Sequence, residues 1–385
     1  MEKTLSLNEQ PVIKERNYGI DLLRLVSMLM VVSLHILEFY VGGVMKGAES
    51  LTFKGEFLWT LEILCLGAVN IYALISGFVG YKSRHKASNI IYLCLQLIFF
   101  TLIISGTDLI LSIRQGAELS AKDVFLSFFP SIKGYWYFSA YFCLFFFMPI
   151  LDKIIESASR KSLKIAAVLC FCVFCCFTQI FTEVSGLEGG YTVLWLVLLY
   201  LLGAYISRYD PLKNWSAWAC FLGYAVCVAL TVISRVAIGY GTLYLLDEIK
   251  WINLLVSYTS PTVTAGAVFV LCGFSKLRIG KIPAKIIAFL SPMAFGVYLI
   301  HCHPIIFSYF IGAFEWINQY PIWQIPLTVL AISLFIFSSC LFIDGIRLAL
   351  FKLCRIKRLS IFLERIIGKF IKSILKIFHI SLENE

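Results

Sequence analysis

The first apolar stretch of the chain, residues 18–40, carries four ionisable side chains: Asp21, Arg24, His35 and Glu38. An α-helix turns about 100° and rises about 1.5 Å per residue, so Arg24 and His35 should share one face about 16 Å apart. Asp21 and Glu38 fall within about 100° of the same face. The stretch therefore predicts a helix with one polar stripe, which joins a guanidinium suited to anions to an imidazole that can accept a proton.

A structural interpretation of this stripe stays open, in which Asp21 and Arg24 form an interfacial ion pair and His35 packs through a hydrogen bond. Ionisable groups inside a membrane are costly when they face lipid, so they usually face a protein interior or a wet cavity. More such residues occur in the outer halves of other apolar stretches, namely Glu62, Asp108, His301 and His303. This convergence favours a shared polar cavity.

The composition identifies a membrane protein, because 60% of the 385 residues are hydrophobic and only 15% are charged. These values exclude an ordinary soluble domain. Apolar runs near the length of about 20 residues that spans a bilayer predict about ten transmembrane helices. The predicted spans are residues 18–40, 57–80, 88–113, 134–155, 162–182, 190–207, 215–237, 251–274, 286–311 and 322–343. We expect an all-α, polytopic transmembrane bundle.

The distribution of Lys and Arg sets the predicted orientation. With the N-terminus inside, 25 of the 33 basic residues fall on the cytoplasmic side and seven outside, as positively charged inner loops require. The net charge of +10 then reflects this bias, and no nucleic-acid partner is expected. The first helix is too long and too charged for a cleaved signal peptide, so we expect it to remain.

Three regions follow from this reading: a cytoplasmic segment 1–17, a membrane domain 18–343 and a basic tail 344–385. In the tail, apolar residues recur every three to four positions with basic residues between them, which predicts an amphipathic helix on the anionic cytoplasmic leaflet. A simple anchor is the favoured role of this helix. The 13 cysteines lie mostly in apolar runs, where they act as small hydrophobes, so no metal site is predicted.

Four sequence elements resemble the integral-membrane acyltransferase family 3, which acylates cell-surface polysaccharides and related envelope molecules. The first is an Arg, ten intervening residues and a His, here Arg24 and His35. The others are "NIYALISGFVGYK" with Ser76-Gly77, "YWYFSAYFCLFFFMPIL" with Trp136-Tyr137, and "FGVYLIHCHPII" with Tyr298 and His301. The elements cover most of the chain in the family's order, although Leu22 stands where many members have Gly.

The resemblance implies transfer of a short acyl group, acetyl by default, from cytoplasmic acyl-CoA to an envelope glycan or lipid-linked saccharide. It implies a bacterial cytoplasmic membrane enzyme with no bound cofactor, for which acyl-CoA is a co-substrate. His35 would be the general base, Glu38 would orient it, and His301 or Tyr298 would polarise the thioester carbonyl or hold the acceptor.

The donor and acceptor sites follow from the same resemblance. The phosphates of the donor would bind at the inner, cationic end of the site. Five residues would form this donor-binding end. These are Arg24, Ser76, Gly77, Lys82 and Arg84. Trp136, Tyr137 and Tyr298 would lie on the acceptor side. Three of these features also have a purely structural explanation. Ser76-Gly77 could serve only helix packing, and Lys82 and Arg84 could be ordinary inner-loop positive charge. Trp136-Tyr137 could belong to an interfacial aromatic belt.

Two other function classes stay open from the sequence. A secondary transporter would also have about ten spans and buried charges, but it would predict inverted repeats, and no clear repeat is visible. A non-catalytic envelope scaffold would predict polar spans without a donor site. His303 precedes Pro304 and is expected to cap a helix break or to meet water, and not to take part in the chemistry.

The charge distribution predicts that both termini are cytoplasmic. A reporter that fluoresces only in the cytoplasm, fused after Glu385, should therefore be bright. A well-expressed but dark fusion would contradict the spanning order.

Overall fold

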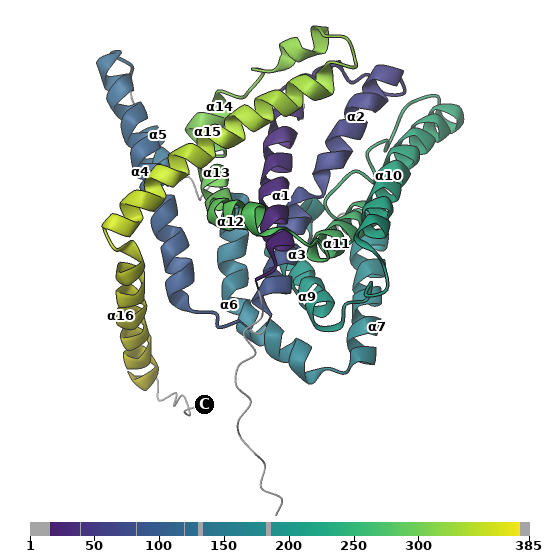
Figure 1. Cartoon of the computed structure of the whole chain (residues 1–385). Helices are drawn as coiled ribbons and strands as arrows, with labels where there is room; N and C mark the ends of the chain where they lie inside the picture. Colours follow the sequence, from purple (N-terminus) through teal and green to yellow (C-terminus); the bar gives the residue numbers. More distant parts are fainter. Residues whose placement is uncertain are drawn as a thin grey trace, which may run out of the picture.

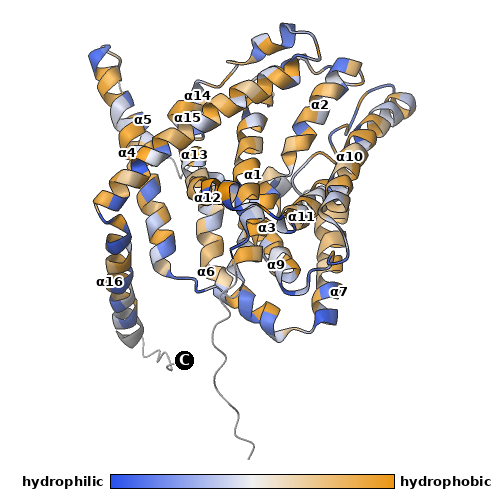
Figure 2. Cartoon of the chain, viewed as in Figure 1, coloured by the Kyte–Doolittle hydropathy of each residue, from blue (hydrophilic) through white to orange (hydrophobic). Residues whose placement is uncertain are grey.

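A computed structural model describes residues 16–38, 40–81, 83–118, 120–129, 134–181 and 186–377. Within these ranges the chain forms helices and no strand (Figure 1). The helices are hydrophobic along most of their length, and hydrophilic residues gather near many of their ends (Figure 2). The predicted all-α polytopic bundle is therefore confirmed.

Among the described residues, eight helical segments are long and apolar enough to cross a membrane. They are Tyr18–Leu37, Phe53–Gly80, Ala87–Arg114, Trp136–Ser157, Arg160–Ile180, Ala217–Leu246, Lys281–His301 and Ile325–Leu353. Two shorter apolar helices, α9 (Val193–Tyr209) and α11 (Pro261–Ser275), account for the other predicted spans. Each predicted run thus contains a helix, whereas the number of crossings stays a prediction.

Three predicted spans are interrupted or shorter than expected. The second predicted span is divided at Gly67 into two helices, α2 (Phe53–Leu66) and α3 (Ala68–Gly80). The eighth begins only at Pro261, which supplies the fixed φ suited to a first helical turn. The ninth divides into α12 (Lys281–Leu290), a 3-10 turn, α13 (Ala294–His301) and α14 (Pro304–Ser308).

Helix α1 (Tyr18–Leu37) begins where the sequence predicts and ends three residues early. The Asn17 side chain caps the start by accepting a hydrogen bond from the Ile20 N–H, at 3.1 Å. Glu38 follows the last helical residue and has ψ 133°. Its N–H still donates to the Leu34 carbonyl oxygen at 2.8 Å, as in a helix, so Glu38 lies one turn after His35 and the chain leaves the helix only beyond it.

Helix α1 lies in the middle of the bundle (Figure 1). It contacts helices that come from both halves of the sequence, and most of its residues are buried. Its neighbours are α2, α3, α11, α12, α13 and α15 (Ile325–Leu353). This central position explains how one helix can carry a polar stripe, because the surrounding helices separate that stripe from lipid.

Helices α3 and α9 approach closely through two glycines. A Cβ added at Gly77 would lie 2.0 Å from the Tyr200 carbonyl oxygen, and one at Gly203 would lie 2.1 Å from the Leu74 carbonyl oxygen. Small residues at such crossings let two backbones pack against each other. The packing interpretation of Gly77 is therefore confirmed.

The tail forms α16 (Ile356–Ile377), which packs along α4 (Ala87–Arg114) and touches the end of α15. Hydrophobic and hydrophilic residues are mixed along its length, as the sequence predicts (Figure 2). Residues 378–385 lie outside the described part of the chain. Contact with the lipid leaflet stays a prediction for this helix.

The close crossing of α3 and α9 predicts that Gly77→Ala lowers stability, because even a methyl group would collide with the Tyr200 carbonyl. Overpacking of this kind costs about 1–3 kcal/mol. Gly106→Ala in α4 is the matched control, since a Cβ there meets nothing within 4 Å and Ala favours the helix. Thermal unfolding in one detergent should show a lower midpoint for Gly77→Ala only; equal midpoints would contradict the packing argument.

Candidate active site

A cavity of about 450 Å³ lies beside the first half of α1. Its lining includes Arg24 from α1, Tyr72 and Ser76 from α3, and Arg84 from the loop that follows α3. Helix α6 (Trp136–Ser157) adds aromatic side chains, and Tyr137 is one of them. The cavity thus combines cationic groups with an aromatic wall. We call it the inner cavity.

The charge of the inner cavity is set by Asp21 and its partners. The Asp21 carboxylate accepts hydrogen bonds from Arg24 Nη1 at 2.8 Å, Arg16 Nε at 2.5 Å and the Ser291 hydroxyl at 3.3 Å. Two guanidinium groups share one carboxylate, so one positive charge remains. Arg24 therefore forms the ion pair expected with Asp21 and also lines the cavity. Its side chain is 31% exposed.

The other predicted donor residues have different positions. The Ser76 hydroxyl lines the inner cavity and donates to the Tyr72 carbonyl at 2.9 Å. Arg84 also lines it. Gly77 packs against α9, as described above, and Lys82 lies outside the described residues.

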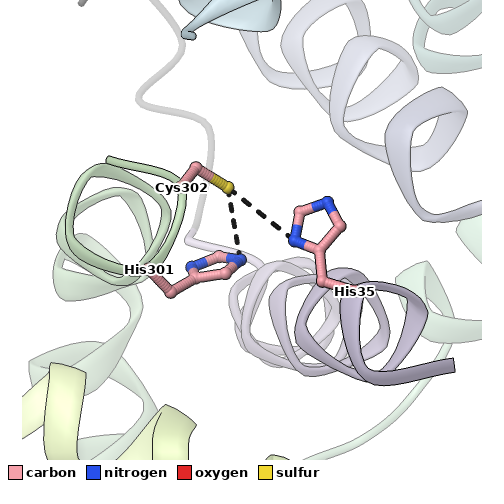
Figure 3. A group of neighbouring side chains, drawn as sticks. All are labelled: His35, His301 and Cys302. Atoms are coloured by element: carbon pink, nitrogen blue, oxygen red, sulfur yellow. Dashed lines mark hydrogen bonds between the residues drawn. The ribbon is translucent and has the colours of Figure 1, made fainter. Parts of the chain in front are cut away.

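Three side chains meet at the other end of α1: His35, His301 and Cys302 (Figure 3). The imidazole rings of His35 and His301 have centroids 5.2 Å apart. Cys302 Sγ lies 3.3 Å from His301 Nε2 and 3.9 Å from His35 Nδ1. The sequence elements that hold His35 and His301, which lie 266 positions apart, thus meet in space. We call this group the histidine cluster.

The protonation of His301 follows from its backbone contact. Its Nδ1 lies 2.6 Å from the Val297 carbonyl oxygen, and a carbonyl can only accept, so Nδ1 carries the proton in the neutral ring. Nε2 then has a free lone pair directed at the Cys302 thiol, 3.3 Å away. His301 is fully buried and Cys302 is 8% exposed, whereas His35 is partly exposed.

The histidine cluster also has the donor set of a soft-metal site. One ligand atom from each of its three residues lies within 4.8 Å of the others. Ligand atoms on one tetrahedral Zn²⁺ lie about 3.3–3.7 Å apart, given bond lengths of about 2.0–2.3 Å. A backbone carbonyl on His301 Nδ1 is likewise typical of a metal-binding histidine. Cys302 was missed from the sequence because it was grouped with the packing cysteines.

Glu38 belongs to a second, acidic group. It interacts electrostatically with Glu62 of α2, and both carboxyl groups influence Tyr191 and Tyr258. Within the described residues, the ring and hydrogen-bond contacts of His35 are with His301, Cys302 and Phe307. The orienting role expected of Glu38 therefore stays a prediction without a contact to His35.

The predicted acceptor residues divide between two places. Trp136 packs against Tyr191 at 4.6 Å and stacks with Tyr258 at 6.3 Å between ring centroids, beside the acidic group. Tyr137 lines the inner cavity, and its ring lies 6.4 Å from that of Tyr298, one helical turn before Cys302. Tyr137 and Tyr298 thus connect the inner cavity to the histidine cluster.

Two further histidines have clear roles. His303 caps α14, because its Nδ1 accepts a hydrogen bond from the Ile305 N–H at 3.3 Å, so the predicted cap is confirmed. His85 lines the inner cavity and contacts Asp152 at 2.8 Å. The sequence reading missed His85 because it stands between Arg84 and Lys86, where the whole run was read as inner-loop charge.

Comparison with protein families decides the class of the chain. A family model described as an acyltransferase domain, Acyl_transf_3, matches residues 17–347. The chain belongs to this family. The resemblance seen in the four sequence elements is thereby confirmed. The matched residues contain the whole histidine cluster and every residue that lines the inner cavity except Arg16. Comparisons with curated proteins and with solved structures give no match.

Proposed function

We propose that this acyltransferase moves a short acyl group, acetyl by default, from cytoplasmic acyl-CoA to a hydroxyl of an envelope glycan or lipid-linked saccharide. The membrane would be the bacterial cytoplasmic membrane. One observation carries the proposal: α1 presents Arg24 to the inner cavity and His35 to the histidine cluster. The two positions are about 16 Å apart along the helix. A donor with anionic and reactive ends could contact both.

The donor end of the proposal rests on charge and shape. Arg24 retains exposed surface and shares Asp21 with a second arginine, so the inner cavity offers a positive site to phosphate. The thioester arm would extend along Tyr137 and Phe295, which both line the cavity and lie beside Tyr298. This route leads the acyl carbon toward the histidine cluster. Acyl-CoA acts here as a co-substrate, with no resident cofactor.

The chemical step needs one base and one leaving group. The acceptor hydroxyl oxygen attacks the thioester carbonyl, and His35 takes the hydroxyl proton. The C–S bond then breaks, and CoA leaves as a thiolate that takes the proton from the His35 imidazolium, which returns His35 to its neutral form. Neutral His301 cannot donate from Nε2, because its proton is on Nδ1, so its proposed role is to position the acceptor or the thiol of Cys302.

The acceptor end rests on the acidic and aromatic group. The carboxyl groups of Glu38 and Glu62 can accept hydrogen bonds from sugar hydroxyls. The rings of Trp136, Tyr191 and Tyr258 lie next to them and offer flat apolar surfaces for a saccharide. This combination suits a neutral polyhydroxylated acceptor, while the inner cavity suits an anionic donor.

Arg24→Lys should weaken acyl transfer although it preserves the charge, because a bidentate contact with phosphate needs the planar guanidinium. A loss of about 1.4 kcal/mol in binding free energy corresponds to a tenfold loss of affinity. The loss of one hydrogen bond to a charged group is of this size, so we expect the KM for acetyl-CoA to rise roughly tenfold. Steady-state kinetics on purified protein would measure this, and raised acetyl-CoA should restore the rate. A wild-type KM would limit Arg24 to pairing with Asp21.

His35→Gln should reduce transfer by roughly two to four orders of magnitude, because glutamine keeps a hydrogen bond but cannot take the proton. The measurement is acylated glycan formed per mole of membrane protein. His303→Asn is the matched control, since asparagine can still cap α14 and activity should persist.

Two outcomes would contradict the base assignment. Substantial turnover by His35→Gln would exclude proton transfer to this residue. A stoichiometric metal ion in the wild type that is lost from His35→Gln would make His35 a ligand of the histidine cluster.

A further inference from the structure

A second cavity, of about 940 Å³, lies between α16 and the start of α4. Its lining holds Arg84 and Lys86 from the loop before α4, and Lys357 and Arg365 from α16. Glu364 is the acidic residue on the same lining, so the four basic groups leave a clear positive excess. We call this space the tail cavity.

The tail cavity adjoins the inner cavity. Arg84, Asn89 and Leu93 line both of them, so the two cavities are neighbours at the start of α4. The combined shape has a wide, basic, polar compartment followed by a narrower aromatic one that contains Arg24. A molecule with a bulky polyanionic end and a slender thioester arm has the same two parts.

The position of α16 is unlike that of a simple surface anchor. Its side chains at Lys357, Ser360 and Arg365 line the cavity against α4, and Ser360 is 1% exposed. A helix that only lies on a leaflet would direct its basic residues to lipid phosphates. Here two of them line a cavity that continues toward Arg24.

We propose that the tail cavity binds the phosphorylated nucleotide end of acyl-CoA, so that α16 forms part of the donor site. The inference rests on the proposed function and names how its donor is recognised. The 3′-phosphate and the diphosphate carry about four negative charges, which match the four basic side chains of the lining in number. The arm then enters the inner cavity past Arg84.

Phosphate chemistry alone would also fit a lipid headgroup, and both ligands would use the same cations. The two sources differ in one testable respect. The coenzyme carries a 3′-phosphate that acetyl-dephospho-CoA lacks, whereas a lipid effect depends on the bilayer. An experiment that varies the donor and the lipid separately therefore distinguishes them.

The test compares Arg365→Gln with Arg358→Gln, which makes the same change on the same helix outside the cavity lining. Full-length protein in nanodiscs of neutral lipid is assayed with acetyl-CoA and with acetyl-dephospho-CoA. We expect Arg365→Gln to raise the KM for acetyl-CoA roughly tenfold at unchanged kcat, and to reduce the wild-type preference for the 3′-phosphorylated donor. Arg358→Gln should keep wild-type values for both donors.

Several results would overturn the inference. Identical kinetics of the two variants, or an unchanged donor preference in Arg365→Gln, would remove α16 from the donor site. An effect of Arg365→Gln that appears only in nanodiscs with anionic lipid would assign the tail cavity to lipid headgroups. If Arg24→Lys raises the KM while Arg365→Gln does not, the proposed function stands without α16. A wild type that neither binds nor consumes acetyl-CoA would instead end the proposed function itself.

Discussion

The cost of placing ionisable side chains within a membrane governs this structure. Each charged or polar group in the apolar spans must find a partner or a wet cavity. Helix α1 meets this requirement by lying at the centre, where Arg24 is paired with Asp21 and His35 faces His301. Helix α3, which contacts α1, packs closely against α9 at the crossing of Gly77 and Gly203.

Two other arginines are buried in ion pairs outside the candidate site, where no ligand is needed to stabilise their charge. Arg235 is 1% exposed, donates to both oxygens of Glu56 at 2.5 and 2.7 Å, and covers the Trp59 ring at 4.3 Å. Arg347 and Asp344 form a buried pair with contacts of 2.6 and 2.9 Å. Further N–H groups of the two arginines donate to Asn253 and Tyr92, each at 3.1 Å, so both guanidinium groups are held by several protein partners. The histidine cluster differs, because His35 makes only a 3.9 Å contact to sulfur and ring contacts in the described structure.

The features that depend on local helical periodicity could be predicted from the sequence. The contacts between residues that are far apart in the sequence could not. The spacing of Arg24 and His35 was enough to predict a shared face, because helix geometry is fixed. Gly67, Ser291 and Glu38 break or end helices that hydropathy alone reads as continuous. The contact of His85 with Asp152 could not be predicted, because the two residues are remote in sequence. Cys302 is adjacent to its nearer partner His301, but only the fold brings both of them to His35.

The helix break between α12 and α13 connects these points. At the break, Ser291 donates to Asp21 and so completes the set of donors around the inner carboxylate. After the break, α13 lies close to α15, where a Cβ at Gly296 would come within 2.0 Å of Asp344. That close approach fixes the helix whose last residue is His301, facing His35. Ser291 thus reaches one end of α1 and His301 reaches the other, so the segment on either side of this short 3-10 turn relates the two ends of the candidate site.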